Sequence, residues 1–387
     1  MQLSVIILNY NVRYFLEQCV LSVQEAIAGL DAEIIVVDNN SSDESVLMME
    51  KRFPEVKLIQ NKENFGFPKG NNIGVAHAVG KYICILNPDT VVAEDTFFAI
   101  LAFAERQIDL GIVGCKLIDG RGNFLPESKR GIPTPWVAFT KIFGLYKIFP
   151  NQKLFNQYYA QHLDKNKTGK VAILVGAFMF MGRDLYHDLE GFDEKCFMYA
   201  DDIDLSFRAL QKQKSNYYFH EATVLHYKGE STVKDGKYMN HFQEAMHFFY
   251  KKHFRQSWFF TVFIEIGIVF FSIVKLFQGK QKSKPLPESY ILYSSNIKLS
   301  QKLTSIFKNK VAILDFKKEK MLNSYLIFKG KRIEIILDNH YVSFKNCIKI
   351  IETVKDKSIT FKIFPKNSNF IIGSNSRNDR GQVVKIE

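Results

Sequence analysis

Three polar side chains stand directly behind runs of strand-forming apolar residues in the first hundred positions. Asn9 follows "LSVIIL", Asp38 ends "EIIVVD", and Asp89 follows "ICILNP". Parallel strands bring their carboxyl ends to one edge of a sheet, and ligands of open α/β sheets bind beyond that edge. The sequence therefore predicts that these three side chains meet at one rim and contact a polar ligand.

A second group of carboxylates lies further along the chain, in "MYADDIDL". Asp201 and Asp202 are adjacent, and Asp204 follows two positions later. A carboxylate beside like charge has a raised pKa and becomes a better general base, so the first two are candidates for proton transfer. Acidic residues also favour the start of a helix, and we expect that structural role for Asp204.

Two stretches at the first rim suit a nucleobase. "LNYN" places Tyr10 after the first strand, where its ring could face a base, although a core aromatic is the alternative. "VVDNNSSDES" ends the second strand in a polar turn that contains Asp38 and Asn40. Asp38 could accept a hydrogen bond from a pyrimidine N3–H, or it could cap the next helix together with Ser41.

The stretch "NFGFPKGNN" is predicted to form a turn before a helix and to bind phosphate. Gly66 would allow close approach of the backbone, Lys69 would add positive charge, and Asn72 lies in the same turn. The N-terminus of the following helix would favour an anion. The pattern GxxxxGK[ST] of a P-loop does not occur, and an ordinary structural turn is the alternative.

The first hundred residues alternate between strand and helix patterns. Apolar runs at 3–8, 33–38, 56–61 and 81–87 have the length of buried strands, and the segments 12–27, 42–53 and 71–80 have helical spacing. This alternation predicts an α/β fold with a mostly parallel sheet that helices cover on both faces. Residues 126–170 lack clear periodicity and are expected to form a long loop with partial helices.

Composition suggests how the remaining chain is organised. We expect a catalytic domain over residues 1–255, an aromatic, amphipathic helix over 256–278, a linker over 279–289 and a small basic α/β domain of unknown role over 290–387. From Gly279 onward there are 22 Lys and Arg against 9 Asp and Glu, so this tail carries the excess of the net charge of +12. No nucleic-acid recognition motif accompanies that charge, and no nucleic-acid partner is expected.

The segment "WFFTVFIEIGIVFFSIVKLF", residues 258–277, has the length of a bilayer span. Glu265 and Lys275 interrupt it and lie on a narrow polar stripe at helical spacing, which is typical of a helix in the membrane interface. Packing within the protein and a true span are the alternatives. With the basic tail, the pattern predicts peripheral contact with an anionic membrane.

Five motifs in order, "SVIILNYN", "VVDNNSSDES", "NFGFPKGNN", "LNPDT" and "LEGFDEKCFMYADDIDLSFR", resemble the family 2 inverting glycosyltransferases. The similarity is strongest to the rhamnosyltransferase-like branch that builds bacterial surface polysaccharides, and it covers roughly residues 2–255. The resemblance implies a GT-A fold, a nucleotide-diphosphate sugar as donor, dTDP- or UDP-linked, and a divalent cation, Mg²⁺ or Mn²⁺. It further implies a glycan or lipid-linked acceptor.

The resemblance also assigns roles at the matching positions. Asp89 would bind the cation in a DxD-like motif whose first acidic position is Asn87, and His226 in "VLHYKGEST" would be a further metal ligand. Asp202 would be the general base, and Asp201, in place of the usual Glu, would orient the acceptor or Asp202. A plain turn at Pro88-Asp89 and a structural histidine are the alternatives.

Other functions fit these motifs less well. A sugar-nucleotide nucleotidyltransferase would be expected to carry a Gly-rich, basic loop after the first strand, where this chain has "LNYNVRYF". A processive synthase would need several spans and a QxxRW-type motif, and a non-catalytic glycan- or nucleotide-binding module is the non-enzyme alternative. The five cysteines show no CxxC pairing, which favours reduced thiols and a cytoplasmic location. With the predicted membrane contact, we expect the protein at the inner face of the cytoplasmic membrane.

Overall fold

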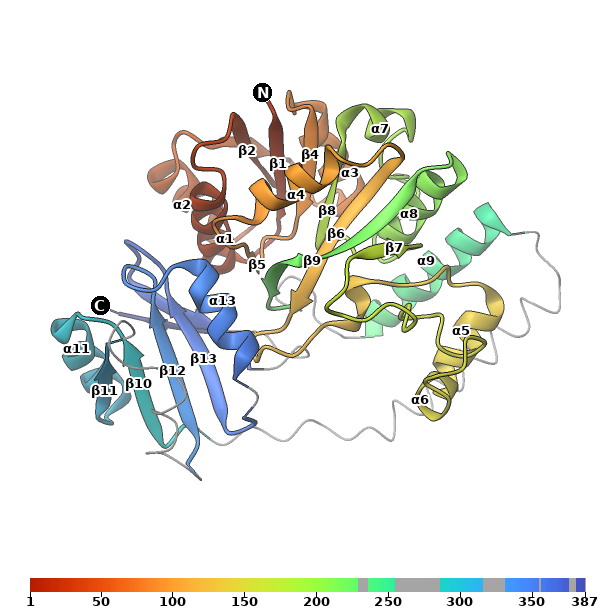
Figure 1. Ribbon diagram of the computed structural model, residues 1–387. Helices are drawn as coiled ribbons and strands as arrows, with labels where there is room; N and C mark the ends of the chain where they lie inside the picture. Colours follow the sequence, from red (N-terminus) through yellow and green to blue (C-terminus); the bar gives the residue numbers. More distant parts are fainter. Residues whose placement is uncertain (229–235, 255–285, 316–330, 355, 376–380, 387) are drawn as a thin grey trace.

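The computed structural model describes residues 1–228, 236–254, 286–315, 331–354, 356–375 and 381–386, which fold around two β-sheets (Figure 1). In the first sheet the strand order is β3-β2-β1-β4-β8-β6-β9-β5, and β7 pairs with β9. Its strands are β1 (Leu3–Asn9), β2 (Ala32–Asp38), β3 (Lys57–Gln60), β4 (Tyr82–Leu86), β5 (Thr90–Val91), β6 (Leu110–Ile118), β7 (Gly169–Val171), β8 (Phe178–Gly182) and β9 (Ser215–His226).

The four strands nearest the amino terminus are parallel, as their apolar runs predicted. β1 pairs in parallel with both β2 and β4, and β2 pairs in parallel with β3. Asn9 lies opposite Asp38 in the register of β1 and β2. The predicted meeting of these two side chains at the carboxyl edge is therefore observed. β8 enters between β4 and β6 and runs antiparallel to both.

Helices cover both faces of this sheet, because side chains of successive strand residues point to opposite faces. The helices are α1 (Arg13–Ala26), α2 (Ser45–Arg52), α3 (Gly66–Ala76), α4 (Thr96–Ala104), α5 (Pro135–Ile142), α6 (Leu145–Ile148), α7 (Arg183–Asp188), α8 (Asp201–Gln211) and α9 (Gly236–His253). α1, α2 and α4 share one core with Val5 and Ile7, and α3, α7 and α8 share the other core with Ile6 and Leu8. The fold class expected for this part of the chain is confirmed.

Helix α3 corrects the interpretation of "NFGFPKGNN". The helix begins at Gly66, so Lys69 and Asn72 lie within it and not in a turn before it. A Cβ atom on Gly70 would lie 2.5 Å from Leu8 Cδ1, so that glycine lets the helix pack tightly on β1. Glycine in this stretch suggested close approach to a phosphate, but at Gly70 the missing side chain allows close approach of the helix to the sheet.

The second sheet lies at the carboxyl-terminal end of the chain, with strand order β11-β10-β12-β13-β14-β15. Its elements are β10 (Ser289–Tyr293), α11 (Ile297–Phe307), β11 (Val311–Leu314), β12 (Ile333–Asp338), α13 (Phe344–Thr353), β13 (Ile359–Phe364), β14 (Phe370–Gly373) and β15 (Gln382–Lys385). Strands β10, β11, β12 and β13 pair in parallel, in keeping with the small α/β domain expected here. Division of the chain into domains at 1–255 and 290–387 stays a prediction.

The two sheets share a hydrophobic core, so the carboxyl-terminal part packs directly on the first (Figure 1). Phe15 and Tyr227 of the amino-terminal part belong to the same buried cluster as Phe344 and Ile351 of the α13 helix. Polar contacts reinforce this core, because the Glu94 carboxylate accepts hydrogen bonds from the backbone N–H groups of Phe344 (2.6 Å) and Lys345 (2.8 Å) at the start of α13.

The two parts also approach each other closely at a turn after β6. Gly122 has φ +74°, and a Cβ atom there would lie 1.8 Å from the Ile351 carbonyl oxygen. Only glycine fits both the left-handed backbone and that contact. The predicted membrane helix at 256–278 lies outside the described residues, as does most of the predicted linker. Of the helices in the described part of the chain, none has both the length and the apolar character to cross a membrane.

Candidate active site

At the first rim, a chain of hydrogen bonds fixes Asp38. Asn9 Nδ2 donates to Asp38 Oδ1 at 2.7 Å, and the backbone N–H of Ser41 donates to Asp38 Oδ2 at 2.8 Å. Helix α2 begins only at Ser45 and has no side-chain cap at its N-cap position, so Asp38 closes a turn and does not cap the helix. The carboxylate is 2% exposed and its orientation is set before any ligand binds.

Two predicted nucleobase contacts lie beside Asp38 on the surface. Tyr10 is 36% exposed directly after β1, so its ring is accessible to a base. Asn40 is exposed and has φ 61°, which marks the tight turn that follows β2. The structure places both residues at the same carboxyl edge as Asp38, and their contact with a nucleobase stays a prediction.

Gly66 joins this rim to the segment that precedes the carboxylate pair. Its φ is +77°, and a Cβ atom would lie 2.7 Å from the Phe197 ring. Asn39 Nδ2 donates to the Gly66 carbonyl (3.0 Å), and the Phe67 N–H donates to the Phe197 carbonyl (3.2 Å). Lys69 lies one turn further on, with Nζ 3.9 Å from the centre of the Phe65 ring.

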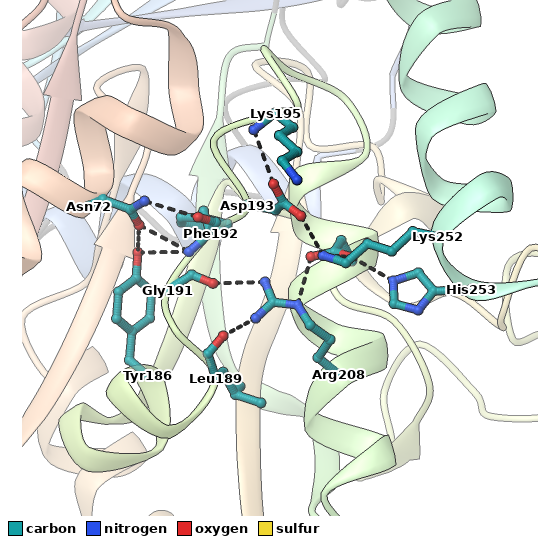
Figure 2. A network of polar contacts seen from close by, with 11 residues as sticks. Asn72, Tyr186, Leu189, Gly191, Phe192, Asp193, Lys195, Arg208, Lys252 and His253 are labelled. Carbon is teal, nitrogen blue, oxygen red and sulfur yellow. Dashed lines mark hydrogen bonds and ion pairs between the residues drawn. The ribbon is translucent and has the colours of Figure 1, made fainter.

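Asn72 has a different role from the one expected. Its Nδ2 donates to the Phe192 carbonyl and to Glu194 Oε1, both at 2.9 Å. Its Oδ1 accepts from the Tyr186 hydroxyl (2.6 Å) and the Phe192 N–H (3.0 Å) (Figure 2). These four bonds use the full capacity of the amide. Direct binding of a donor by Asn72 does not fit this geometry, and the residue positions the loop after α7.

The DxD-like stretch and His226 converge as the resemblance implied. Asp89 Oδ1 lies 3.3 Å from His226 Nε2, and Asn87 Nδ2 lies 3.4 Å from the same nitrogen. The pairing of β5 with β9 causes this meeting, because it sets Thr90 opposite His226, and the Tyr227 N–H donates to the Asp89 carbonyl at 3.0 Å.

The chemistry of this cluster fits a divalent cation. Asp89 is 3% exposed, yet its Oδ1 accepts no hydrogen bond from the described residues, which is costly for a buried carboxylate oxygen unless a further group binds it. Within the described part of the chain no three His, Cys, Asp or Glu side chains are grouped to enclose an ion. Two protein ligands with open positions suit Mg²⁺ or Mn²⁺ bound together with substrate oxygens.

The carboxylate pair lies at the start of α8 and is held by a residue that the motifs did not identify. Arg130 Nη2 donates to Asp202 Oδ2 at 2.6 Å, and the Gly176 N–H donates to the same oxygen at 3.0 Å. Asp202 Oδ1 is buried and has no hydrogen-bond partner among the described residues. Asp202 thus has one oxygen held in place and the other available to accept a proton.

Asp201 is electrostatically distinct from its neighbour. Burial, followed by the negative charge of Asp202, raises the pKa of Asp201 to about 8. Asp201 is therefore mostly protonated at neutral pH, and the guanidinium of Arg130 is paired with the neighbouring Asp202. The raised pKa that the sequence predicted for this pair is that of Asp201, whereas Asp202 is the residue expected to act as the base.

The cluster of Asp89, Asn87 and His226 and the carboxylate pair lie on either side of one short segment. The Gly176 N–H donates to Asp202, and the next residue, Ala177, accepts through its carbonyl from the Asn87 N–H at 3.0 Å. Two adjacent peptide groups thus link the two predicted centres. The arrangement brings the residue expected to act as a base close to the residues expected to bind a cation.

A buried ionic network holds α8 in position (Figure 2). Asp204 accepts hydrogen bonds from Arg208 Nε (2.7 Å) and His253 Nε2 (2.6 Å), and Lys252 Nζ lies 2.9 Å from its Oδ1. Burial raises the pKa of Asp204, but the hydrogen bond from His253 and the charge of Arg208 outweigh it and lower the pKa to about 2. The structural role expected for Asp204 is consistent with this network.

Comparison with known proteins agrees with the site. Residues 4–190 match the family model described as Glycosyl transferase family 2. An N-acetylglucosaminyl-diphospho-decaprenol L-rhamnosyltransferase of Mycobacterium tuberculosis is 25% identical over 244 residues, which cover 60% of this chain and 78% of that protein. A GalNAc(5)-diNAcBac-PP-undecaprenol beta-1,3-glucosyltransferase of Campylobacter jejuni is 30% identical over 130 residues, 33% of this chain and 41% of the relative.

Among solved structures, a mannosyltransferase from Pyrobaculum calidifontis in complex with GDP-Man and Mn²⁺ aligns with a TM-score of 0.45 and 16% identity, over 72% of this chain and 76% of the other. The strand order of the first sheet and the match to the family model do not depend on that distant likeness. Residues 4–190, just under half of the chain, match glycosyl transferase family 2, and this match together with the curated relatives supports a glycosyltransferase.

Proposed function

We propose that the protein transfers a sugar from a nucleotide diphosphate to an acceptor hydroxyl with inversion, assisted by Mg²⁺ or Mn²⁺. The observation that carries the proposal is the short path from Asp89 to Asp202. Asn87, two residues before Asp89, and Asp202 bond to the adjacent peptide groups of Ala177 and Gly176. A base on one side of the reacting carbon and a charged leaving group on the other is the arrangement that inversion requires.

In this mechanism Asp202 acts as the general base. Its Oδ2 is held by Arg130 and Gly176, so Oδ1 is the atom that removes the proton from the acceptor hydroxyl as that oxygen attacks the anomeric carbon. Asp201, neutral at pH 7, supplies a hydrogen-bond donor beside it and orients the acceptor or Asp202. The nucleoside diphosphate leaves from the opposite face.

Asp89 and His226 would hold the cation, with the Asn87 amide beside them. The cation, when bound, neutralises charge on the departing diphosphate. Asp38, fixed by Asn9, would accept the N3–H of a pyrimidine, and Tyr10 would contact the ring face. A pyrimidine nucleotide, dTDP or UDP, is the donor class that these groups favour.

The acceptor is proposed to be a lipid-linked glycan at the inner face of the cytoplasmic membrane, and the transferred sugar to be a 6-deoxyhexose such as rhamnose. Support comes from two relatives whose names specify polyprenol-linked acceptors, one of them an L-rhamnosyltransferase. Peripheral membrane contact through residues 258–277 and the basic tail remains part of the proposal.

The experiment that tests this function screens the full chain against dTDP- and UDP-sugars by thermal shift with and without Mn²⁺. We expect one donor to raise the melting temperature only in the presence of the cation. The product of that donor and a lipid-linked acceptor should have the opposite anomeric configuration to the donor by NMR. Retention of configuration, or stabilisation that ignores the cation, would contradict the mechanism.

A further inference from the structure

Residues 132–157 form an aromatic lobe that projects from the body of the protein and contains α5 and α6 (Figure 1). The lobe holds six aromatic residues, three lysines and no Asp or Glu. Four of its large apolar side chains are exposed to solvent: Trp136 (41%), Ile148 (64%), Phe149 (41%) and Leu154 (54%). A soluble surface rarely gathers so many apolar side chains in a segment this short without a partner.

These side chains belong to one organised patch. The Trp136 indole N–H donates to the Leu154 carbonyl at 2.9 Å, which brings α5 against the turn after α6. The Phe155 ring packs against two other rings of the lobe, with its centroid 5.9 Å from that of Trp136 and 5.1 Å from that of Phe149. The patch is therefore preformed, and its apolar residues lie together on the lobe.

Charge around the patch favours an anionic partner. Lys147 immediately precedes Ile148 and Phe149, Lys153 immediately precedes Leu154, and both lysines are exposed. Aromatic and aliphatic side chains flanked by lysines are the pattern of segments that insert into the headgroup region of a bilayer. Trp in particular is enriched at that depth, because its ring is apolar and its N–H is polar.

The base of the lobe is tied to the catalytic residues. Lys129 Nζ donates to the carbonyls of Tyr159 (3.1 Å) and Ala160 (3.0 Å), and the Gly131 N–H donates to the Tyr158 carbonyl (3.1 Å). Between Lys129 and Gly131 stands Arg130, the residue that holds Asp202. A surface bound by the lobe would therefore lie on the side of the protein where the base receives the acceptor.

We propose that the aromatic lobe docks on the anionic membrane that carries the lipid-linked acceptor and presents its headgroup sugar to Asp202. The proposal rests on the proposed function for the acceptor, but the docking itself depends only on the patch. It is independent of residues 258–277, whose contribution to membrane binding is a separate expectation.

The test uses Trp136 as a local probe. The chain has two tryptophans, Trp136 and Trp258, so the full-length Trp258→Phe variant reports on the lobe alone. With phosphatidylglycerol vesicles that contain brominated acyl chains, Trp136 emission should shift to the blue and be quenched, and salt should reduce both effects. Phosphatidylcholine vesicles should produce much smaller changes.

Matched variants identify the patch. In the Trp258→Phe background, Phe149→Ser combined with Leu154→Ser should weaken the affinity for these vesicles, measured by the quenching, by about tenfold or more. The reason is the lost burial of two large apolar side chains. Ile108→Ser removes an equally apolar and fully exposed side chain from the loop before β6, and should change nothing. The double variant should also transfer sugar normally to a water-soluble acceptor and poorly to a polyprenol-linked acceptor in vesicles.

Two outcomes would overturn the proposal. If the protein sediments with anionic vesicles while Trp136 emission does not change, another segment binds the membrane and the lobe does not. If ultracentrifugation without lipid shows a dimer that the double variant dissociates, a second copy covers the patch. A wild-type protein that transfers no sugar to any acceptor would refute the proposed function and leave the vesicle result standing.

Discussion

The ion pair between Arg130 and Asp202 provides a quantitative test of the site. The two side chains are each 11% exposed, and their charge centres are separated by about 4 Å, so at an effective dielectric of about 20 the attraction is about 4 kcal/mol. Removal of one partner leaves a buried charge without its counterion. Arg130→Met and Asp202→Asn should each lower the free energy of unfolding by about 3–5 kcal/mol, and the double variant should recover most of that loss.

Urea unfolding of the four proteins measures this coupling, and transfer assays on the same samples separate stability from catalysis. Asp202→Asn should reduce turnover by about 10²–10⁴-fold while donor binding persists, whereas Arg130→Met keeps the base and should lose less. Lys170→Met breaks the exposed pair with Asp109 and should change the free energy of unfolding far less, because solvent screens that pair. A coupling below about 0.5 kcal/mol, or near-normal transfer by Asp202→Asn, would refute the reasoning.

Three further changes test other parts of the site. Asp89→Ala should abolish Mn²⁺-dependent donor binding in calorimetry with little change in melting temperature, and unchanged donor affinity would contradict the metal assignment. Because the folded state raises the pKa of Asp201 from 3.8 to about 8, the native protein keeps a proton that the unfolded chain releases, so its contribution to stability falls as pH rises through that range. Asp201→Asn should remove this fall in urea midpoints measured from pH 5 to pH 8, and parallel curves for the two proteins would exclude it. Gly66→Ala forces a Cβ into the Phe197 ring at positive φ and should lower stability by more than about 1 kcal/mol in urea unfolding; a wild-type midpoint would show that the segment relaxes freely.

The strand ends were predictable because their signal is local. An apolar run that stops at a polar residue gives both the strand and the position of that residue at the rim, which is why Asn9 and Asp38 were placed correctly. Arg130 gave no such signal. Its partner lies 72 residues away, and it stands in a segment without periodicity, so only the tertiary fold shows that it holds Asp202.

Glycine was ambiguous for a physical reason. A missing side chain permits close approach of a phosphate, of a helix or of an aromatic ring, and sequence does not distinguish these partners. Gly70 packs α3 on β1 and Gly66 accommodates Phe197, although the stretch that contains both glycines was expected to bind phosphate. The amide of Asn72 was misassigned for the same reason, because its partners Tyr186 and Phe192 follow more than a hundred residues later.

The shared core between the two sheets also bears on how the chain folds during synthesis. The apolar surface formed by Phe15, Leu225 and Tyr227 has been synthesised about a hundred residues before strand β12, which helps to cover it, emerges from the ribosome. At roughly 5–20 residues per second, that apolar surface stays uncovered for about 5–20 s. A chain cut near Leu286 would keep it uncovered permanently, so removal of the carboxyl-terminal part should produce an aggregation-prone fragment before it reveals anything about that part's role in catalysis.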